Sequence, residues 1–283
     1  MREDDGALRP EDYMEPRCVL CAEPYGRERV QAVPQRRIIE KMDEYMARRD
    51  YAGAERHLLY WLAEARQGGD RRGELMLLGE LVGHYRKTGA REKALARAEE
   101  ALALLRALEL EDTISAGTTY VNAATAYSAF GEQGRALALF QKARAVYEAS
   151  ELTPPQDLGG LYNNMALTCV ALGKFPEAYE LYDRADAAMS GVPGGALERA
   201  ITCLNRADAL AAERGSEAAE EAVGALLDRA WTLLHDDGAA RDGYCAFVYE
   251  KCAPGFSHYG RFMDALELQK EAEELYERAS AIP

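Results

Sequence analysis

Apolar and small residues recur along this chain with the spacing of amphipathic helices. One predicted helix, ending near residue 130, has an apolar stripe at positions i, i+3, i+4 and i+7, formed by Tyr120, Ala123, Ala124 and Tyr127. Gly131 follows, and a second stripe of small and aromatic residues comes after it. Because glycine readily takes the left-handed conformation that ends a helix, the pattern predicts two helices joined by a tight turn.

This helix–turn–helix pattern repeats at an interval of 42 residues. The interval separates the turn glycines Gly89, Gly131 and Gly173, and also the alanines Ala94, Ala136 and Ala178. A fixed period of roughly 20 to 50 residues indicates stacked units, none of which can bury its apolar face alone. We therefore predict an all-α fold, an α-solenoid of stacked antiparallel helical hairpins.

The period divides the chain into an arm and an array. Residues 1–35 lack the period and contain four prolines, which predicts an irregular N-terminal arm. About six repeats follow over residues 36–280, and their predicted spans are 36–69, 75–112, 117–154, 159–195, 196–237 and 238–280.

The outer repeats depart from the pattern. In the first repeat Arg49 stands where the others have the turn glycine, and in the fifth a few residues are inserted around 214–217. The insertion predicts either a longer loop or a helix extension. Pro254 lies inside the first helix of the last repeat, and we expect it to kink or break that helix. The polar segment 263–280 is predicted to cap the array.

The repeated residues resemble the tetratricopeptide repeat, whose unit has a large residue, then Leu, Gly or Ala, Tyr, Gly, Ala, an aromatic residue and Ala at these spacings. The standard unit has about 34 residues. The longer unit is similar to those of kinesin light chain and of some bacterial peptide-sensing regulators, and the stretch 162–178 carries most of that similarity. The resemblance implies a right-handed solenoid whose first helices line a concave groove that binds other proteins.

Three asparagines are candidates for that groove. Asn122, Asn164 and Asn205 lie 42 and 41 residues apart on three successive first helices. A side-chain amide has both a donor and an acceptor, so it can pair with a peptide backbone whatever the peptide's sequence. The resemblance implies such contacts at these positions. Alternatively, the asparagines bond to neighbouring helices and fix the stacking of repeats.

Side chains around the asparagines are candidates for selecting the ligand. These candidates are Thr125, Leu167, Val170 and Asp208. Arg86 and Lys87 are candidates for a clamp on a C-terminal carboxylate of the ligand, as in some family members. The alternative for this basic pair is a solvated helix face.

The net charge of the chain bears on which classes of partner it can bind. The net charge is −14, which argues against binding to nucleic acid or to an anionic membrane surface. There is neither an apolar run long enough to span a membrane nor an apolar segment typical of a secretory signal. We expect a cytoplasmic, bacterial protein with a protein or peptide partner. The sequence leaves the oligomeric state open.

No pattern in the sequence indicates catalysis. Cys18 and Cys21 form a CxxC pair, but no second pair follows, and the four histidines are scattered. We predict no enzyme activity, no cofactor and no metal. Alternatives for the pair are zinc shared with another chain or a redox role.

Two functions remain as alternatives to a peptide-binding module. One is a regulatory receptor for a peptide signal that acts on a separate effector, and the other is a self-associating scaffold. The N-terminal arm is also a candidate for folding back into the groove.

Overall fold

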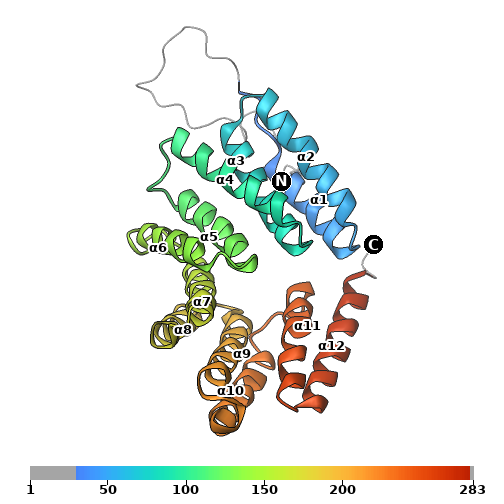
Figure 1. Ribbon diagram of the computed structural model, residues 1–283. Helices are drawn as coiled ribbons and strands as arrows, with labels where there is room; N and C mark the ends of the chain where they lie inside the picture. Colours follow the sequence, from blue (N-terminus) through green and yellow to red (C-terminus); the bar gives the residue numbers. More distant parts are fainter. Residues whose placement is uncertain (1–29, 281–283) are drawn as a thin grey trace. The chain divides into compact units, whose positions relative to one another are not determined.

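The computed structural model describes residues 30–280, and within them the chain forms twelve helices and no strand (Figure 1). Their bounds are α1 Gln35–Ala47, α2 Tyr51–Gln67, α3 Arg71–Lys87, α4 Arg91–Ala107, α5 Ile114–Ala129, α6 Gln133–Glu148, α7 Pro155–Ala171, α8 Phe175–Met189, α9 Gly195–Arg214, α10 Ser216–Leu234, α11 Gly243–His258 and α12 Phe262–Ser280. Consecutive helices pair as antiparallel hairpins (Figure 1), so the predicted all-α solenoid of hairpins is confirmed. The chain divides into two compact units, with unit 1 ending at Leu104 and unit 2 beginning at Leu105.

The turn glycines have the backbone that the sequence predicted. Gly89, Gly131 and Gly173 have φ angles of 72°, 83° and 71°, in the left-handed region that other residues enter at a steric cost. Arg49 has the same kind of backbone without being glycine, with φ of 54°. The first hairpin therefore turns as the others do and carries a local backbone strain.

Two irregular features of the sequence are resolved by the helix bounds. The insertion near residue 215 extends a helix, because α9 runs for 20 residues to Arg214 and only Gly215, with φ of 84°, precedes α10. The predicted break at Pro254 is wrong, because α11 continues from Gly243 to His258 with the proline inside it. The missing Pro254 N–H removes one hydrogen bond, and the buried residues on both sides of it hold the helix together.

Unit 1 has aspartates at the starts of two helices. Asp50 accepts a hydrogen bond from the Gly53 N–H at 2.8 Å, and Asp70 accepts one from the Gly73 N–H at 2.9 Å. Buried Asp70 also accepts the Val33 N–H at 2.9 Å. The described end of the predicted arm is thereby bound to the connection between α2 and α3, and residues 1–29 lie outside the described part.

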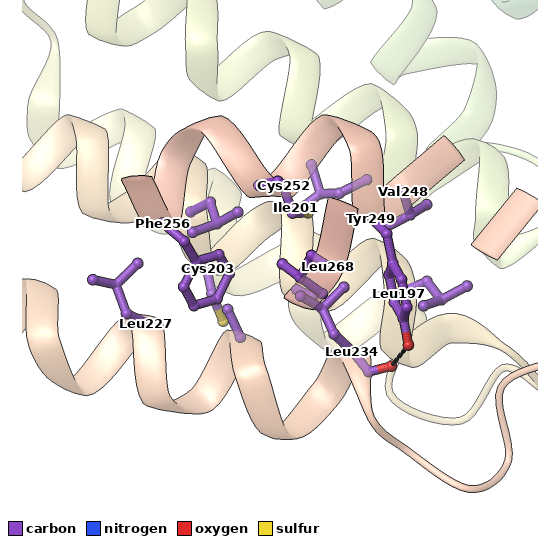
Figure 2. Close-up of a cluster of buried hydrophobic side chains, with 14 of the residues drawn as sticks. Leu197, Ile201, Cys203, Leu227, Leu234, Val248, Tyr249, Cys252, Phe256 and Leu268 are labelled. Atoms are coloured by element: carbon purple, nitrogen blue, oxygen red, sulfur yellow. Dashed lines mark hydrogen bonds between the residues drawn. The ribbon is translucent and has the colours of Figure 1, made fainter. Parts of the chain in front are cut away.

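The core of the last two hairpins in unit 2 combines small and large side chains (Figure 2). Ala207, Ala230 and Ala253 are fully buried and let helix backbones approach closely, while Tyr249 and Phe256 fill the space beside them. The hydroxyl of Tyr249 donates to the Leu234 carbonyl at 2.9 Å (Figure 2). That bond ties α11 to the end of α10.

The outer side of α12 is less polar than a cap needs. Phe262, Met263 and Leu266 are exposed to 67%, 75% and 60%. The charged residues predicted to make this helix a cap lie further along it, while its first turns present apolar side chains to solvent.

Candidate functional site

One face of unit 2 gathers polar and aromatic side chains from three first helices. Residues three or four apart share a helix face, and this spacing aligns a set that we call the α7–α9–α11 face. Its members are Gly160, Asn163 and Leu167 on α7, Glu198, Asn205 and Asp208 on α9, and Tyr244, Phe247 and Lys251 on α11. None of these nine residues is fully buried.

Two asparagines form the middle of this face. The Asn205 Nδ2 donates to Asn163 Oδ1 at 3.1 Å across 42 residues of sequence. Asn164 instead donates from its Nδ2 to the Gly160 carbonyl of its own helix at 2.8 Å. The side chain of α7 that pairs with Asn205 is therefore that of Asn163. Asn122 lies half-buried on α5.

A cavity of 460 Å³ opens at one end of the asparagine pair. Its lining includes Gly160 from α7, Glu198 from α9 and Tyr244 from α11, together with apolar residues of the α8–α9 connection. The Tyr244 hydroxyl donates to Glu198. Burial raises the pKa of the Glu198 carboxyl, and the positive charge of Lys251 opposes that shift.

A second cavity, of 610 Å³, lies toward the other end of α9 and α11. Asp208, His258 and Tyr259 contribute its polar groups, and Pro254 and Gly255 part of its wall. The Tyr259 hydroxyl donates to Asp208 Oδ1 at 2.7 Å. Burial and this bond to a carboxylate raise the pKa of Tyr259.

Exposed apolar side chains accompany the cavities. Leu167, Tyr244 and Phe247 are exposed to 39%, 46% and 45%, and the two rings stack with centroids 6.2 Å apart. Grouped exposed aromatic residues are typical of binding surfaces. The α7–α9–α11 face thus combines amides, apolar surface and two hollows.

The remaining residues predicted for the groove are less available to a ligand or lie outside this face. The Thr125 hydroxyl donates to the Asn122 carbonyl of its own helix at 2.9 Å, and Val170 is half-buried. Arg86 and Lys87 are exposed in unit 1, where the Lys87 ammonium lies 5.8 Å from the centre of the Tyr51 ring. The described structure therefore gives Lys87 a neighbour on α2.

Sequence reasoning missed Asn163, Glu198, Tyr244 and Phe247. A strict 42-residue spacing from Asn205 points to Asn163. The other three lie on helices in which the repeat pattern is degenerate, so the pattern did not predict which helix face they occupy. Cys18 and Cys21 lie outside the described residues. None of the described helices has the length and apolar character needed to span a membrane.

Comparisons with known proteins agree with this architecture. Residues 73–149 match the family model described as tetratricopeptide repeat. A solved putative kinesin light chain with TPR-like repeats from Podosopora anserina is 20% identical, with a TM-score of 0.55 over 70% of this chain and 93% of that one. A solved Rap protein complexed with Competence and Sporulation Factor is 14% identical, with a TM-score of 0.55 over 86% of this chain and 64% of that one. No curated protein matches.

The chain therefore contains tetratricopeptide repeats within residues 73–149, and it has the fold of a helical solenoid. The repeat family and the fold together support a protein–protein interaction module in general terms.

Proposed function

We propose that the α7–α9–α11 face binds an extended peptide segment of a partner protein. The observation that carries this proposal is the pair of asparagine amides on the same face as two cavities. An extended segment needs donors and acceptors for its backbone and hollows for alternate side chains. This face has both.

The paired asparagines keep hydrogen-bonding capacity for a ligand. Their mutual bond uses Asn205 Nδ2 and Asn163 Oδ1. Asn205 Oδ1 can accept a further bond and Asn163 Nδ2 can donate one, which is the combination that one peptide unit requires. Stacking and peptide contact are therefore compatible roles for these two residues.

Side-chain selection is assigned to the cavities and the exposed apolar residues. The hollow beside Tyr244 has mostly apolar walls and suits an apolar ligand side chain, which would be removed from water there. Leu167 and Asp208 contact neighbouring ligand positions in this proposal. Asn122, Asn164, Thr125 and Val170 extend the contact along α5 and α7. Arg86 and Lys87 lie in unit 1, and the carboxylate clamp is proposed for that unit separately.

The test is a peptide-display selection on the full chain, followed by affinity measurement with a selected peptide. We expect Asn163→Ala to weaken binding about tenfold, because a lost hydrogen bond of about 1.4 kcal/mol corresponds to that factor. Asn164→Ala is a comparison variant rather than a silent control: the Asn164 amide N–H already donates to its own helix, so we expect a smaller effect than in Asn163→Ala.

Thermal unfolding of the same variants separates binding from stacking. If Asn163→Ala loses much stability but the folded variant binds the peptide as tightly as the wild type, the asparagine pair serves stacking alone. Failure to select any peptide would contradict the proposal.

A regulatory receptor is the second candidate, and the fold likeness to the Rap protein over 86% of this chain favours it. In this version the same face binds a signal and a separate effector reads the result. A self-associating scaffold would instead show a sedimentation coefficient that rises with protein concentration. A cytoplasmic location belongs to this proposal, supported by the free thiols of the four described cysteines.

A further inference from the structure

Three potential metal ligands of unit 2 that are not members of the α7–α9–α11 face converge where the connection after α10 meets α12. They are His235, which directly follows α10, and Glu267 and Glu271 on α12. One ligand atom from each lies within 4.8 Å of the others. The two glutamates are four residues apart and so share one face of their helix.

The hydrogen bonding of His235 fixes which ring nitrogen is available. Its Nδ1 lies 2.9 Å from the Trp231 carbonyl oxygen. Because a carbonyl only accepts, Nδ1 carries the proton and Nε2 keeps a lone pair in the neutral ring. A backbone carbonyl holding the second nitrogen in this way is the usual support of a metal-binding histidine.

The other nitrogen is buried without a hydrogen-bond partner. Nε2 is shielded from solvent and makes no hydrogen bond, and it faces Glu271 Oε2 at 3.8 Å. The ring is held by Trp231, with centroids 4.2 Å apart, and by Tyr249, with centroids 5.9 Å apart. A lone pair fixed toward two carboxylates is an arrangement that a cation completes.

We propose that His235, Glu267 and Glu271 form a binding site for a divalent transition metal, with Zn²⁺ as the best match. Imidazole nitrogen and carboxylate oxygen are both ligands of Zn²⁺, at distances of about 2.0–2.2 Å. Glu267 is exposed and Glu271 half-buried, so their side chains are free to rotate inward to that distance. Three protein ligands leave a coordination position for water.

Arg241 competes with the metal. Its Nη1 lies 3.7 Å from Glu271 Oε2, and its guanidinium also lies 5.5 Å from the centre of the Tyr249 ring. Binding of a cation requires this positive charge to move away from Glu271. Removing the charge should therefore tighten metal binding, which a merely structural cluster would not show.

A metal at this site would join the connection after α10 to α12. Since the ligands come from two hairpins, the metal would bind the folded chain in preference to the unfolded one and raise its melting temperature. The site escapes motif searches because His235 is 32 and 36 residues from the two glutamates.

The experiment is a Zn²⁺ titration by calorimetry on the untagged full chain, in a Cys18→Ser/Cys21→Ser background that removes the CxxC pair. Co²⁺ absorption reports the ligand geometry in parallel. We expect one equivalent to bind. Binding should be weakened at least about tenfold in His235→Gln and in Glu267→Gln/Glu271→Gln, and tightened in Arg241→Gln.

The matched control is Glu273→Gln/Glu277→Gln, which removes the same charge from an exposed i, i+4 pair on the same helix. Its affinity should be unchanged. Absence of Zn²⁺ binding, or an equal loss in the control, would overturn the proposal. Circular dichroism establishes that each variant is folded. If His235→Gln unfolds, the Arg241→Gln result decides, because unchanged or weaker binding there would also overturn it.

Discussion

The two units use the same helical hairpins but place different chemistry on their first helices. In unit 1, the pKa of the half-buried Glu80 on α3 is raised, first by partial loss of solvation and second by the negative charge of Asp43 on α1. In unit 2, the corresponding helices present the paired amides of Asn163 and Asn205. The pKa of Glu198 is raised there too, but its carboxyl accepts a hydrogen bond from the Tyr244 hydroxyl. Helical hairpins are therefore common to both units, and the proposed binding of a neutral peptide backbone rests on the residues at a few positions of unit 2.

The largest difference between the units is expected in the stability that is lost when an aspartate at a helix N-cap is removed. Asp70 in unit 1 is buried and accepts the N–H groups of Gly73 and Val33, whereas Asp242 in unit 2 is exposed and accepts those of Tyr244 and Cys245. Asp70→Ala leaves a buried Val33 N–H unpaired as well as removing the cap. We expect a loss of about 2–3 kcal/mol in the free energy of unfolding, measured by urea denaturation.

Asp242→Ala is the comparison for that prediction, with an expected loss of about 1 kcal/mol. Equal losses in the two variants would mean that the bond from Asp70 to Val33 adds nothing to stability. The attachment of residues 30–34 to unit 1 would then need another explanation.

Left-handed turns should behave alike in both units, because their strain is local. Each unit has one described turn residue of this kind that is not glycine, Arg49 in unit 1 and Glu109 in unit 2, both with φ of 54°. Exposed Glu109→Gly should raise stability by about 1 kcal/mol by removing the clash of its Cβ.

In unit 1, Gly89→Ala should lower stability by about the same 1 kcal/mol. No atom lies within 4 Å of the Cβ it would add, so the cost is that of the backbone alone. A neutral result for both variants in thermal unfolding would show that these turns relax their φ angles.

The smallest effect concerns Glu80 and depends on pH. Its folded pKa lies above the ordinary value of 4.5, so the folded state holds this proton more tightly than the unfolded state does. Stability from this group is present below pH 4.5 and is lost as the pH rises through the folded pKa. Glu80→Gln should therefore stabilise the protein at pH 7 and have little effect at low pH.

Melting temperatures of wild type and Glu80→Gln across that pH range provide the check. Asp43→Asn should reduce the difference, because the negative charge beside Glu80 is removed. A gain from Glu80→Gln that is the same at every pH would mean that burial of the charged carboxyl is not its source.

Much of the fold was readable because glycine and alanine positions are fixed by backbone geometry. The turns at Gly89, Gly131 and Gly173 follow from the need for positive φ, and the helix pairs around them follow from the period. The break expected at Pro254 is absent, because packing on both sides holds α11 together across a lost hydrogen bond. Tertiary contacts outweighed a local rule there.

The candidate site was only partly readable. Asn205 was proposed from the sequence, but its bond to Asn163 depends on how α7 and α9 face each other, which the repeat pattern does not give. The cavities beside Tyr244 and Tyr259 depend on how three helices pack, which no single repeat encodes. The cluster of His235 with Glu267 and Glu271 joins residues from two hairpins for the same reason.

The most direct test of the account is the affinity of one selected peptide, measured by fluorescence anisotropy for two double variants. The account predicts that Asn163→Ala/Asn205→Ala in unit 2 weakens binding by more than about tenfold. Arg86→Ala/Lys87→Ala in unit 1 should weaken it less. Unchanged affinity in the asparagine variant, with the loss confined to the basic pair, would contradict the assignment of the binding surface to the α7–α9–α11 face.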